Sequence, residues 1–538
     1  MGIFAILLLL AIVLVVVIII QRTMSDKDEE GASGADIVAY LVLALAMGVA
    51  GFALTELAST AFPGDTFVFD PAEQVATSLS ALVVSAPFLF YFWRRQARRR
   101  AVYPRSAGWT LYLALMELVF TTAFVIATVL LVNGLISDDS TSSWTGVLVF
   151  GAIVVFHELQ SRITPPLSDA GELRRVFGSA IGLITATIGL VGTLAGLLGV
   201  LLETMGANPV DTGFHPWVAM LVVGAPVWWY RWWRPWDSEP AIPRITWTVV
   251  VTTAAMAVAL GAVTSILVMV LQYLFADVPP AGQHFGTLPV AVSLALAGFP
   301  IWLTHRRLLD DHPPSSLLVY LYAIAALGLS AAVAMATALT IATFSNQLIV
   351  GGGAGDVVTF ASVALAGLAT WIVFDRRATA TEGGIGLAPS WPRRIYTLGV
   401  GVVFALVATG SLITAIFVLL RRLLAGSGSG SLLEPSAIFV YSGLAAFYLL
   451  RSYAADRGAT PPPQHVAPFQ VTLICSHPGM IATKFPEQAR LRVLHRGDDL
   501  GNVGEEMADE IVAAVANRPS LVWVDEAGFR VAPLRVGD

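Results

Sequence analysis

The sequence predicts an all-α protein that crosses a membrane about thirteen times and ends in a small α+β domain. Of its 538 residues, 56% are hydrophobic and 13% are charged, against roughly 25% charged in a soluble domain. Apolar stretches of about 20 residues recur, and each is long enough to cross a bilayer as a helix. The net charge of −6 offers no basic surface for nucleic acid, and the single cysteine, Cys475, excludes a disulfide framework.

The first apolar stretch, residues 3–20, predicts a retained N-terminal anchor with its N-terminus outside. No basic residue precedes it and no Ala-x-Ala cleavage site follows it, unlike a removed signal peptide. The other twelve spans fall into pairs that form helical hairpins. The predicted units are the anchor (1–21), six hairpin repeats (36–100, 108–163, 176–236, 244–312, 316–380 and 393–457), a linker (458–468) and a soluble domain (469–538).

The charges between the spans predict the orientation. Before residue 465, the basic residues gather in alternate loops, as in the cluster from Arg94 to Arg105, and only Arg421 and Arg422 are exceptions. The opposite loops are acidic. Because basic loops stay in the cytoplasm, we expect the C-terminal domain there as well, in a bacterial inner membrane. The orientation of the spans explains these arginines; specific binding of an anionic lipid or of nucleic acid is the less favoured alternative.

An internal repeat marks the second helix of each pair. A small residue recurs every 66 to 76 residues, at positions 85, 151, 224, 298, 367 and 443, and is followed by an aromatic residue and then arginine. Small residues allow helices to approach closely, whereas Trp and Arg are favoured at the membrane interface. Each unit crosses twice, so the repeats are parallel. The predicted interfacial anchors are Trp93, Arg94, Trp228, Arg231, Trp302, Arg306, Trp371, Arg376 and Arg451.

The hairpins resemble a repeated bacterial membrane domain of unknown function. They open with aromatic-rich starts such as Trp109-Thr-Leu-Tyr-Leu, Leu318-Val-Tyr-Leu-Tyr and Arg394-Ile-Tyr-Thr-Leu, and they close with Gly-x-Pro-x-Trp followed by Arg. The resemblance covers residues 36–457, although the second repeat lacks Pro and Trp in its closing helix. It implies a bacterial integral membrane protein and supplies no activity.

Glu117 is the candidate polar site inside the membrane. It lies about eight residues into its span, and no second carboxylate, Lys or His is expected at the same depth. An ionisable residue at that depth is a functional hypothesis by default. It can relay protons, or it can donate a hydrogen bond to a neighbouring helix as structural support. The second interpretation is favoured because a relay needs a partner.

Five glycines of the third hairpin share one helix face and predict tight helix packing, at the centre of the bundle or at a dimer seam. They are Gly182, Gly189, Gly192, Gly196 and Gly199. The sequence offers no catalytic residues, no metal ligands at suitable spacing and no cofactor motif. We therefore expect a protein that is not an enzyme and needs no cofactor.

The C-terminal domain has a soluble composition and alternating patterns. Strands are predicted over 469–475 and 490–495, an amphipathic helix over 502–516, and a hairpin over 520–524 and 529–533. Cys475 follows apolar strand residues and is interpreted as a core thiol rather than a nucleophile.

Two functions remain open. The first is a structural, scaffolding or regulatory platform in the lipid bilayer, whose domain over 469–538 binds a cytoplasmic protein; a homo- or hetero-oligomer fits this hypothesis. The alternative is a transporter or lipid-handling protein that uses the repeated hairpins. Its weakness is the scarcity of charge within the spans.

Overall fold

The computed structural model consists of two compact units, a helical unit and a C-terminal domain. The predicted anchor over 1–21 and nearly all of the linker lie outside the described residues. The structure describes residues 34–61, 71–102, 106–137, 144–164, 168–204, 214–233, 242–276, 278–344, 354–384, 389–425, 431–458, 469–475, 485, 489–495, 505–515, 520–525 and 528–533.

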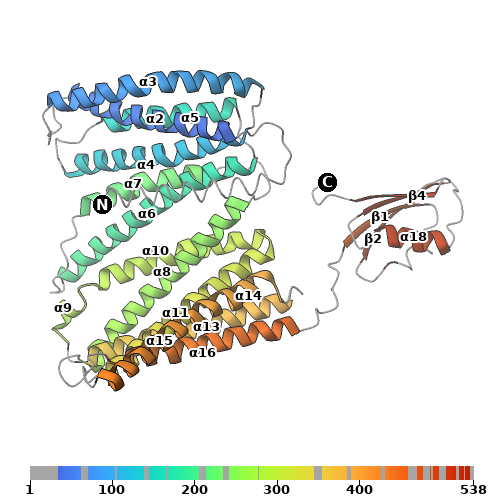
Figure 1. The fold of residues 1–538 in the computed structure, drawn as a ribbon. Coiled ribbons are helices and arrows are strands. Elements are labelled where there is room, and N and C mark those ends of the chain that lie inside the picture. Colours follow the sequence, from blue (N-terminus) through green and yellow to red (C-terminus); the bar gives the residue numbers. More distant parts are fainter. Residues whose placement is uncertain are drawn as a thin grey trace. The chain divides into compact units, whose positions relative to one another are not determined.

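Long helices make up the described helical unit (Figure 1). Two short helices, α9 (Ala281–His284) and α14 (Trp391–Arg394), lie between long ones, and α14 continues through the π-helix η2 (Ile395–Val400) into α15. A 3₁₀ turn, η1 (Leu309–Asp311), follows α10. The long helices are α2 (Gly34–Ala61), α3 (Pro71–Val102), α4 (Ala107–Ser137), α5 (Thr145–Ile163), α6 (Ser168–Thr204), α7 (Phe214–Trp232), α8 (Ile242–Phe275), α10 (Leu288–Leu308), α11 (Pro314–Phe344), α13 (Ala354–Gly384), α15 (Gly401–Ala425) and α16 (Leu433–Gly458).

Eleven helical segments among the described residues are long and apolar enough to cross a membrane. This confirms a multi-pass helical protein, while the count of thirteen spans stays a prediction. Of the twelve spans predicted after the anchor, α7 is the one outside these eleven. It has 19 residues, and its Trp, Tyr, His, Pro and Arg residues lower its mean hydropathy.

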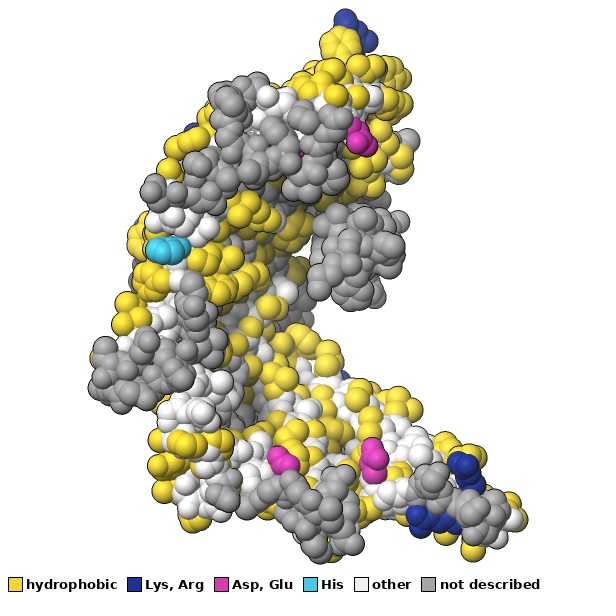
Figure 2. Space-filling model, turned by 90° about the vertical axis from the view of Figure 1, so that its left-hand side faces the viewer, with side chains coloured by type: hydrophobic (Ala, Val, Ile, Leu, Met, Phe, Trp, Pro, Cys, Tyr) yellow, Lys and Arg dark blue, Asp and Glu magenta, His cyan; other side chains and the backbone are white. Residues whose placement is uncertain are grey.

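Hydrophobic side chains cover much of the face in Figure 2, with few charged groups among them. Exposed leucines, valines and phenylalanines occur along most of the long helices, for example Leu45, Val83, Leu406 and Phe417. A soluble protein rarely exposes apolar patches of this extent. The outer surface therefore fits a hydrocarbon solvent.

In three hairpins, the small residue of the closing helix packs against a pair of small residues, four apart, on the opening helix. A methyl group added at Gly224 of α7 would lie 2.9 Å from the carbonyl oxygen of Gly182 and would also meet the backbone of Ala186 on α6. Equivalent close approaches join Gly298 to Ala255 and Ala259, and Gly367 to Gly328 and Ala332. The backbones touch because these positions lack bulky side chains.

The C-terminal domain contains a four-stranded sheet with α18 (Glu505–Val515) on it (Figure 1). Its strands are β1 (Phe469–Cys475), β2 (Ala489–His495), β3 (Ser520–Asp525) and β4 (Gly528–Pro533), in the order β2-β1-β3-β4. β1 pairs in parallel with β2 and β3, while β3 and β4 form the predicted hairpin, with Val522 opposite Val531. Ile511 of α18 packs with Val471 and Val522 in the core. The α+β prediction is confirmed.

Replacing Gly224 with Ala should destabilise the full-length protein by about 1–3 kcal/mol, because the added methyl group forces the backbones of α6 and α7 apart. Gly443→Ala is the matched control: it occupies the corresponding repeat position, and an added methyl group there meets nothing within 4 Å. Thermal unfolding in detergent measures both. Equal melting temperatures for the two variants would contradict the packing described.

Candidate functional site: a buried charge cluster

Glu117 of α4 lies in the interior of the helical unit and is 4% exposed. It sits ten residues after the start of α4, on a helix whose neighbouring residues are almost entirely apolar. Thr121, one turn later on the same helix, donates a hydrogen bond to Oε1 at 3.0 Å. A carboxylate this deeply buried needs compensation, because charge removed from water costs several kcal/mol.

Two arginines provide that compensation. Arg174 of α6 donates from Nε to Glu117 Oε2 at 3.0 Å. Arg231 of α7 places Nη2 2.7 Å from Oε1 and 2.9 Å from Oε2 of the same carboxylate. Both arginines are buried, at 7% and 8% exposed. Charge-assisted hydrogen bonds of this kind are about twice as strong as neutral ones.

A second carboxylate, Glu158 of α5, completes the cluster. Arg231 donates from Nη1 to Glu158 Oε2 at 2.9 Å, and Arg174 pairs with the same oxygen. Arg174 also hydrogen-bonds to Ser161, one turn further along α5. Each arginine thus bridges both glutamates. The four charged side chains, which we call the buried charge cluster (Glu117, Glu158, Arg174 and Arg231), come from four consecutive helices.

The cluster holds two negative and two positive groups, so it is neutral as a whole. Opposite charges in a low-dielectric interior attract strongly, and the geometry shares each guanidinium between two acceptors. Such an arrangement couples α4, α5, α6 and α7 mechanically. Each acidic group among its four members is paired with both arginines.

Gly178 of α6 makes room for the cluster. A methyl group at this position would lie 2.7 Å from Glu117 Oε1 and 3.0 Å from Cγ of Arg231. The backbone of α6 therefore passes directly beside the ion pairs. This glycine is absent from the predicted packing face, which begins one turn later at Gly182.

His157 lies beside the cluster and is itself fully hydrogen-bonded. Nδ1 bonds to the carbonyl oxygen of Ile153 at 2.8 Å, so it carries the proton, and Nε2 accepts from the hydroxyl of Tyr112 at 2.8 Å. Trp109 stacks on Tyr112, with ring centroids 5.5 Å apart. These bonds describe a neutral, structural histidine. Within the described ranges, no three His, Cys, Asp or Glu residues form a group suited to a metal ion.

Two expectations about this region were wrong. Glu117 was expected to lack charged groups at its depth, and Arg231 was expected to point to the membrane interface; instead Arg231 is buried against Glu117. Arg174 lies within α6, which begins at Ser168.

The other predicted anchors differ in their surroundings. Arg94, Arg376 and Arg451 are exposed, and Arg306 pairs with Asp310 at 2.7 Å. Trp93 and Trp228 are partly buried, and Trp228 packs near His305. Trp302 and Trp371 instead donate hydrogen bonds to tyrosines at the start of the next hairpin, to Tyr320 at 2.8 Å and Tyr396 at 2.9 Å. These bonds join consecutive hairpins, a role that the sequence had not indicated.

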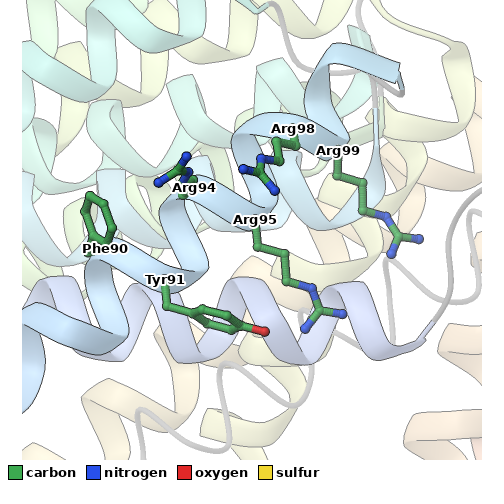
Figure 3. A pocket seen from close by; sticks show the side chains of 6 residues that line it. All are labelled: Phe90, Tyr91, Arg94, Arg95, Arg98 and Arg99. Carbon is green, nitrogen blue, oxygen red and sulfur yellow. The ribbon is translucent and has the colours of Figure 1, made fainter.

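An arginine-rich groove of about 820 Å³ runs along α3 (Figure 3). Its lining residues form two rows with helical spacing, Phe90, Arg94, Arg98 and Tyr91, Arg95, Arg99. Phe90 and Tyr91 are 68% and 59% exposed. An aromatic pair followed by two turns of arginine fits a membrane interface, where rings meet headgroups and guanidinium groups meet phosphate.

The predicted glycine face of α6 turns toward α7. Added methyl groups at Gly182, Gly189 and Gly192 would collide with Trp228, Leu221 and Trp217 respectively. Gly196 and Gly199, further along α6, are buried. Within the helical unit, Gly182, Gly189 and Gly192 therefore mark the contact between the two helices of one hairpin.

Replacing Glu117 with Gln should cost the full-length protein about 3–5 kcal/mol, because two buried guanidinium groups lose part of their compensation. Glu434→Gln is the control, since Glu434 is exposed at the start of α16. Thermal or denaturant unfolding in detergent gives the difference. A Glu117 variant as stable as the control would show that the ion pairs contribute little.

A double-mutant cycle between Glu117 and Arg174 should reveal coupling. Glu117→Gln combined with Arg174→Gln leaves one carboxylate and one guanidinium group, so charge balance returns. We expect the double variant to be more stable than the sum of the single effects predicts, by about 0.5–3 kcal/mol. The corresponding cycle of Glu434→Gln with Arg174→Gln should be additive; additivity in both cycles would contradict a shared network.

Comparison with known proteins identifies similarity to a family of unknown function. A family described as a domain of unknown function (DUF5671) matches residues 36–157 and again residues 172–278. The first match spans α2 to α5 and the second α6 to α8, so the matching unit holds more than one hairpin. No curated protein and no solved structure matches the chain. The predicted resemblance is thereby confirmed: the chain carries two regions similar to a domain of unknown function (DUF5671), and this family brings no activity with it.

Proposed function

We propose that the protein is a structural or regulatory platform of a bacterial inner membrane, whose C-terminal domain binds a protein partner in the cytoplasm. The observation that carries the proposal is the buried charge cluster, in which every charge is neutralised by another helix of the same chain. A network of this kind favours one fixed arrangement of helices. It is better suited to a rigid platform than to a path for ions.

The distribution of arginine supports the proposed orientation. α3 and α10 are closing helices and end in arginines, as the positive-inside rule predicts for cytoplasmic loops. The C-terminal domain follows α16, which ends with Arg457 in its last turn. We therefore assign the domain to the same side as these arginines.

The sheet of the C-terminal domain offers a surface for the partner. Val522 and Val524 of β3 point into the core, whereas Trp523 between them is 41% exposed and pairs in register with Arg530 of β4, which is also exposed. Trp and Arg are the residue types most enriched among energetically dominant interface contacts. We propose that the partner binds over Trp523 and Arg530.

A transporter or lipid-handling function is the second candidate. It is favoured by a cavity of about 450 Å³ that Asp375 of α13 and Tyr448 of α16 line, because clefts of this size accommodate small ligands. The buried charge cluster favours the platform, and the cavity favours a transporter or lipid-handling protein. Transport assays distinguish these two functions.

A photoreactive benzoylphenylalanine in place of Trp523 in the full chain should cross-link one partner of defined mass in living cells. The control carries the same group in place of Glu510, which is exposed on α18. We expect the cross-linked band at position 523 and its absence at position 510. No band specific to position 523 would overturn the proposed partner surface.

Reconstituted full-length protein should show no proton or ion flux above that of protein-free liposomes. A pH-sensitive dye inside the vesicles measures this. A flux that the wild type supports above the protein-free control would refute the platform and favour the transporter.

A further inference from the structure

A polar cavity lies among α11, α13, α14, η2 and α16, apart from the buried charge cluster. Its charged lining residues are Asp375 and Arg376 of α13 and Arg393 of α14, and two tyrosines, Tyr396 and Tyr448, stand beside them. Its volume of about 450 Å³ falls within the range of small-molecule sites. Charged residues of both signs thus meet in one cleft at the arginine-rich end of these helices.

Comparison of two repeats shows that Asp375 departs from the pattern. Trp302 and Trp371 occupy the same place in consecutive closing helices, and each donates a hydrogen bond to a tyrosine of the next opening helix. Four residues after Trp302 stands Arg306, whereas four residues after Trp371 stands Asp375. The positive-inside rule explains an arginine at this position, next to a cytoplasmic loop. It does not explain a carboxylate.

The carboxylate of Asp375 is held in position by the two tyrosines. The hydroxyls of Tyr396 and Tyr448 hydrogen-bond to it, and Trp371 donates to the Tyr396 hydroxyl at 2.9 Å. The ring of Trp371 also packs edge-on against Tyr448, with centroids 5.2 Å apart. Because an ionised carboxylate accepts about four hydrogen bonds, Asp375 keeps acceptor capacity beyond these two.

The backbone is unusual at this cavity. Tyr396 and Thr397 both line it, and both belong to the π-helix Ile395–Val400. π-Helical turns are rare and occur frequently at functional sites, because the wider turn is less favourable than an α-helix. Here the wide turn places two successive side chains, each 4% exposed, toward neighbouring helices.

The remaining lining groups divide into donors and acceptors. Arg376 and Arg393 carry guanidinium groups, which bind phosphate oxygens. The hydroxyls of Thr379, Thr397 and Ser452 already donate to carbonyl oxygens of their own helices at 2.9 Å, so each offers lone pairs to the cavity. The site therefore combines phosphate-binding groups with a carboxylate and hydroxyl acceptors suited to a primary ammonium group.

We propose that this cavity binds the headgroup of an aminophospholipid such as phosphatidylethanolamine, with the phosphate at Arg376 and Arg393 and the ammonium group at Asp375. A membrane lipid is favoured over a free headgroup because the neighbouring side chains are apolar and exposed: Trp391 is 57% and Ile395 is 62% exposed. Acyl chains can lie along this surface. The inference is independent of the partner that the C-terminal domain binds.

Lipid binding to the full-length protein in a maltoside detergent tests the site, with native mass spectrometry counting bound lipids. The probes are dioleoyl phosphatidylethanolamine, dioleoyl phosphatidylcholine, dioleoyl phosphatidylglycerol and soluble O-phosphoethanolamine. We expect the wild type to prefer phosphatidylethanolamine over phosphatidylcholine by about tenfold, the effect of one charge-assisted hydrogen bond that choline cannot donate.

Asp375→Asn should abolish that preference, and Arg376→Gln should lower the affinity for phosphatidylethanolamine by about tenfold. Arg377→Gln is the matched control, because Arg377 is the next residue, is exposed and does not line the cavity. Arg376 is exposed as well, so its variant keeps the test valid if Asp375→Asn fails to fold.

The proposal is overturned if the wild type binds phosphatidylcholine or phosphatidylglycerol as tightly as phosphatidylethanolamine. It is also overturned if Arg376→Gln and Arg377→Gln bind alike. Competition by O-phosphoethanolamine at the same concentration as the lipid would assign the site to a free headgroup and refute the lipid. Preferential binding of phosphatidylethanolamine that only the cavity variants lose would establish it.

Discussion

Four charged side chains buried among helices set the strongest constraint on this fold. Glu117, Glu158, Arg174 and Arg231 come from α4, α5, α6 and α7, and each bonds to two of the others. An uncompensated charge at such a position costs several kcal/mol. A slide of one helix by a single turn would break these pairs, so the cluster fixes the register between the second and third hairpins.

A second and weaker constraint acts within three of the hairpins. A leucine side chain is as well solvated by lipid tails as by a neighbouring helix, so the hydrophobic effect does not drive helices together inside a membrane. Close contact between helix backbones stabilises the pair instead. Gly224 on Gly182 and Ala186, and Gly367 on Gly328 and Ala332, provide it. The charge cluster therefore joins neighbouring hairpins, whereas small residues join the two helices of one hairpin. Hydrogen bonds from Trp302 and Trp371 to tyrosines add further links between hairpins.

Repeats that share packing rules have diverged in their polar residues. The position four residues after the tryptophan carries Arg306 in one hairpin and Asp375 in the next. In the first, the arginine pairs with Asp310 at the surface; in the second, the carboxylate faces a cavity with two arginines. Packing can therefore stay constant while the polar ends of the hairpins acquire separate roles.

The sequence alone determined the features that depend on local pattern. Apolar length predicted the spans, alternation predicted the strands of the C-terminal domain, and the spacing of small residues predicted the repeat. The charge cluster could not be predicted in this way, because its members lie up to 114 positions apart, as Glu117 and Arg231 do, and Arg174 and Arg231 read equally well as topological charges. Only tertiary structure decided that these arginines point inward, since the cost of burying charge is settled by which helices meet and not by the position of a residue in its own span.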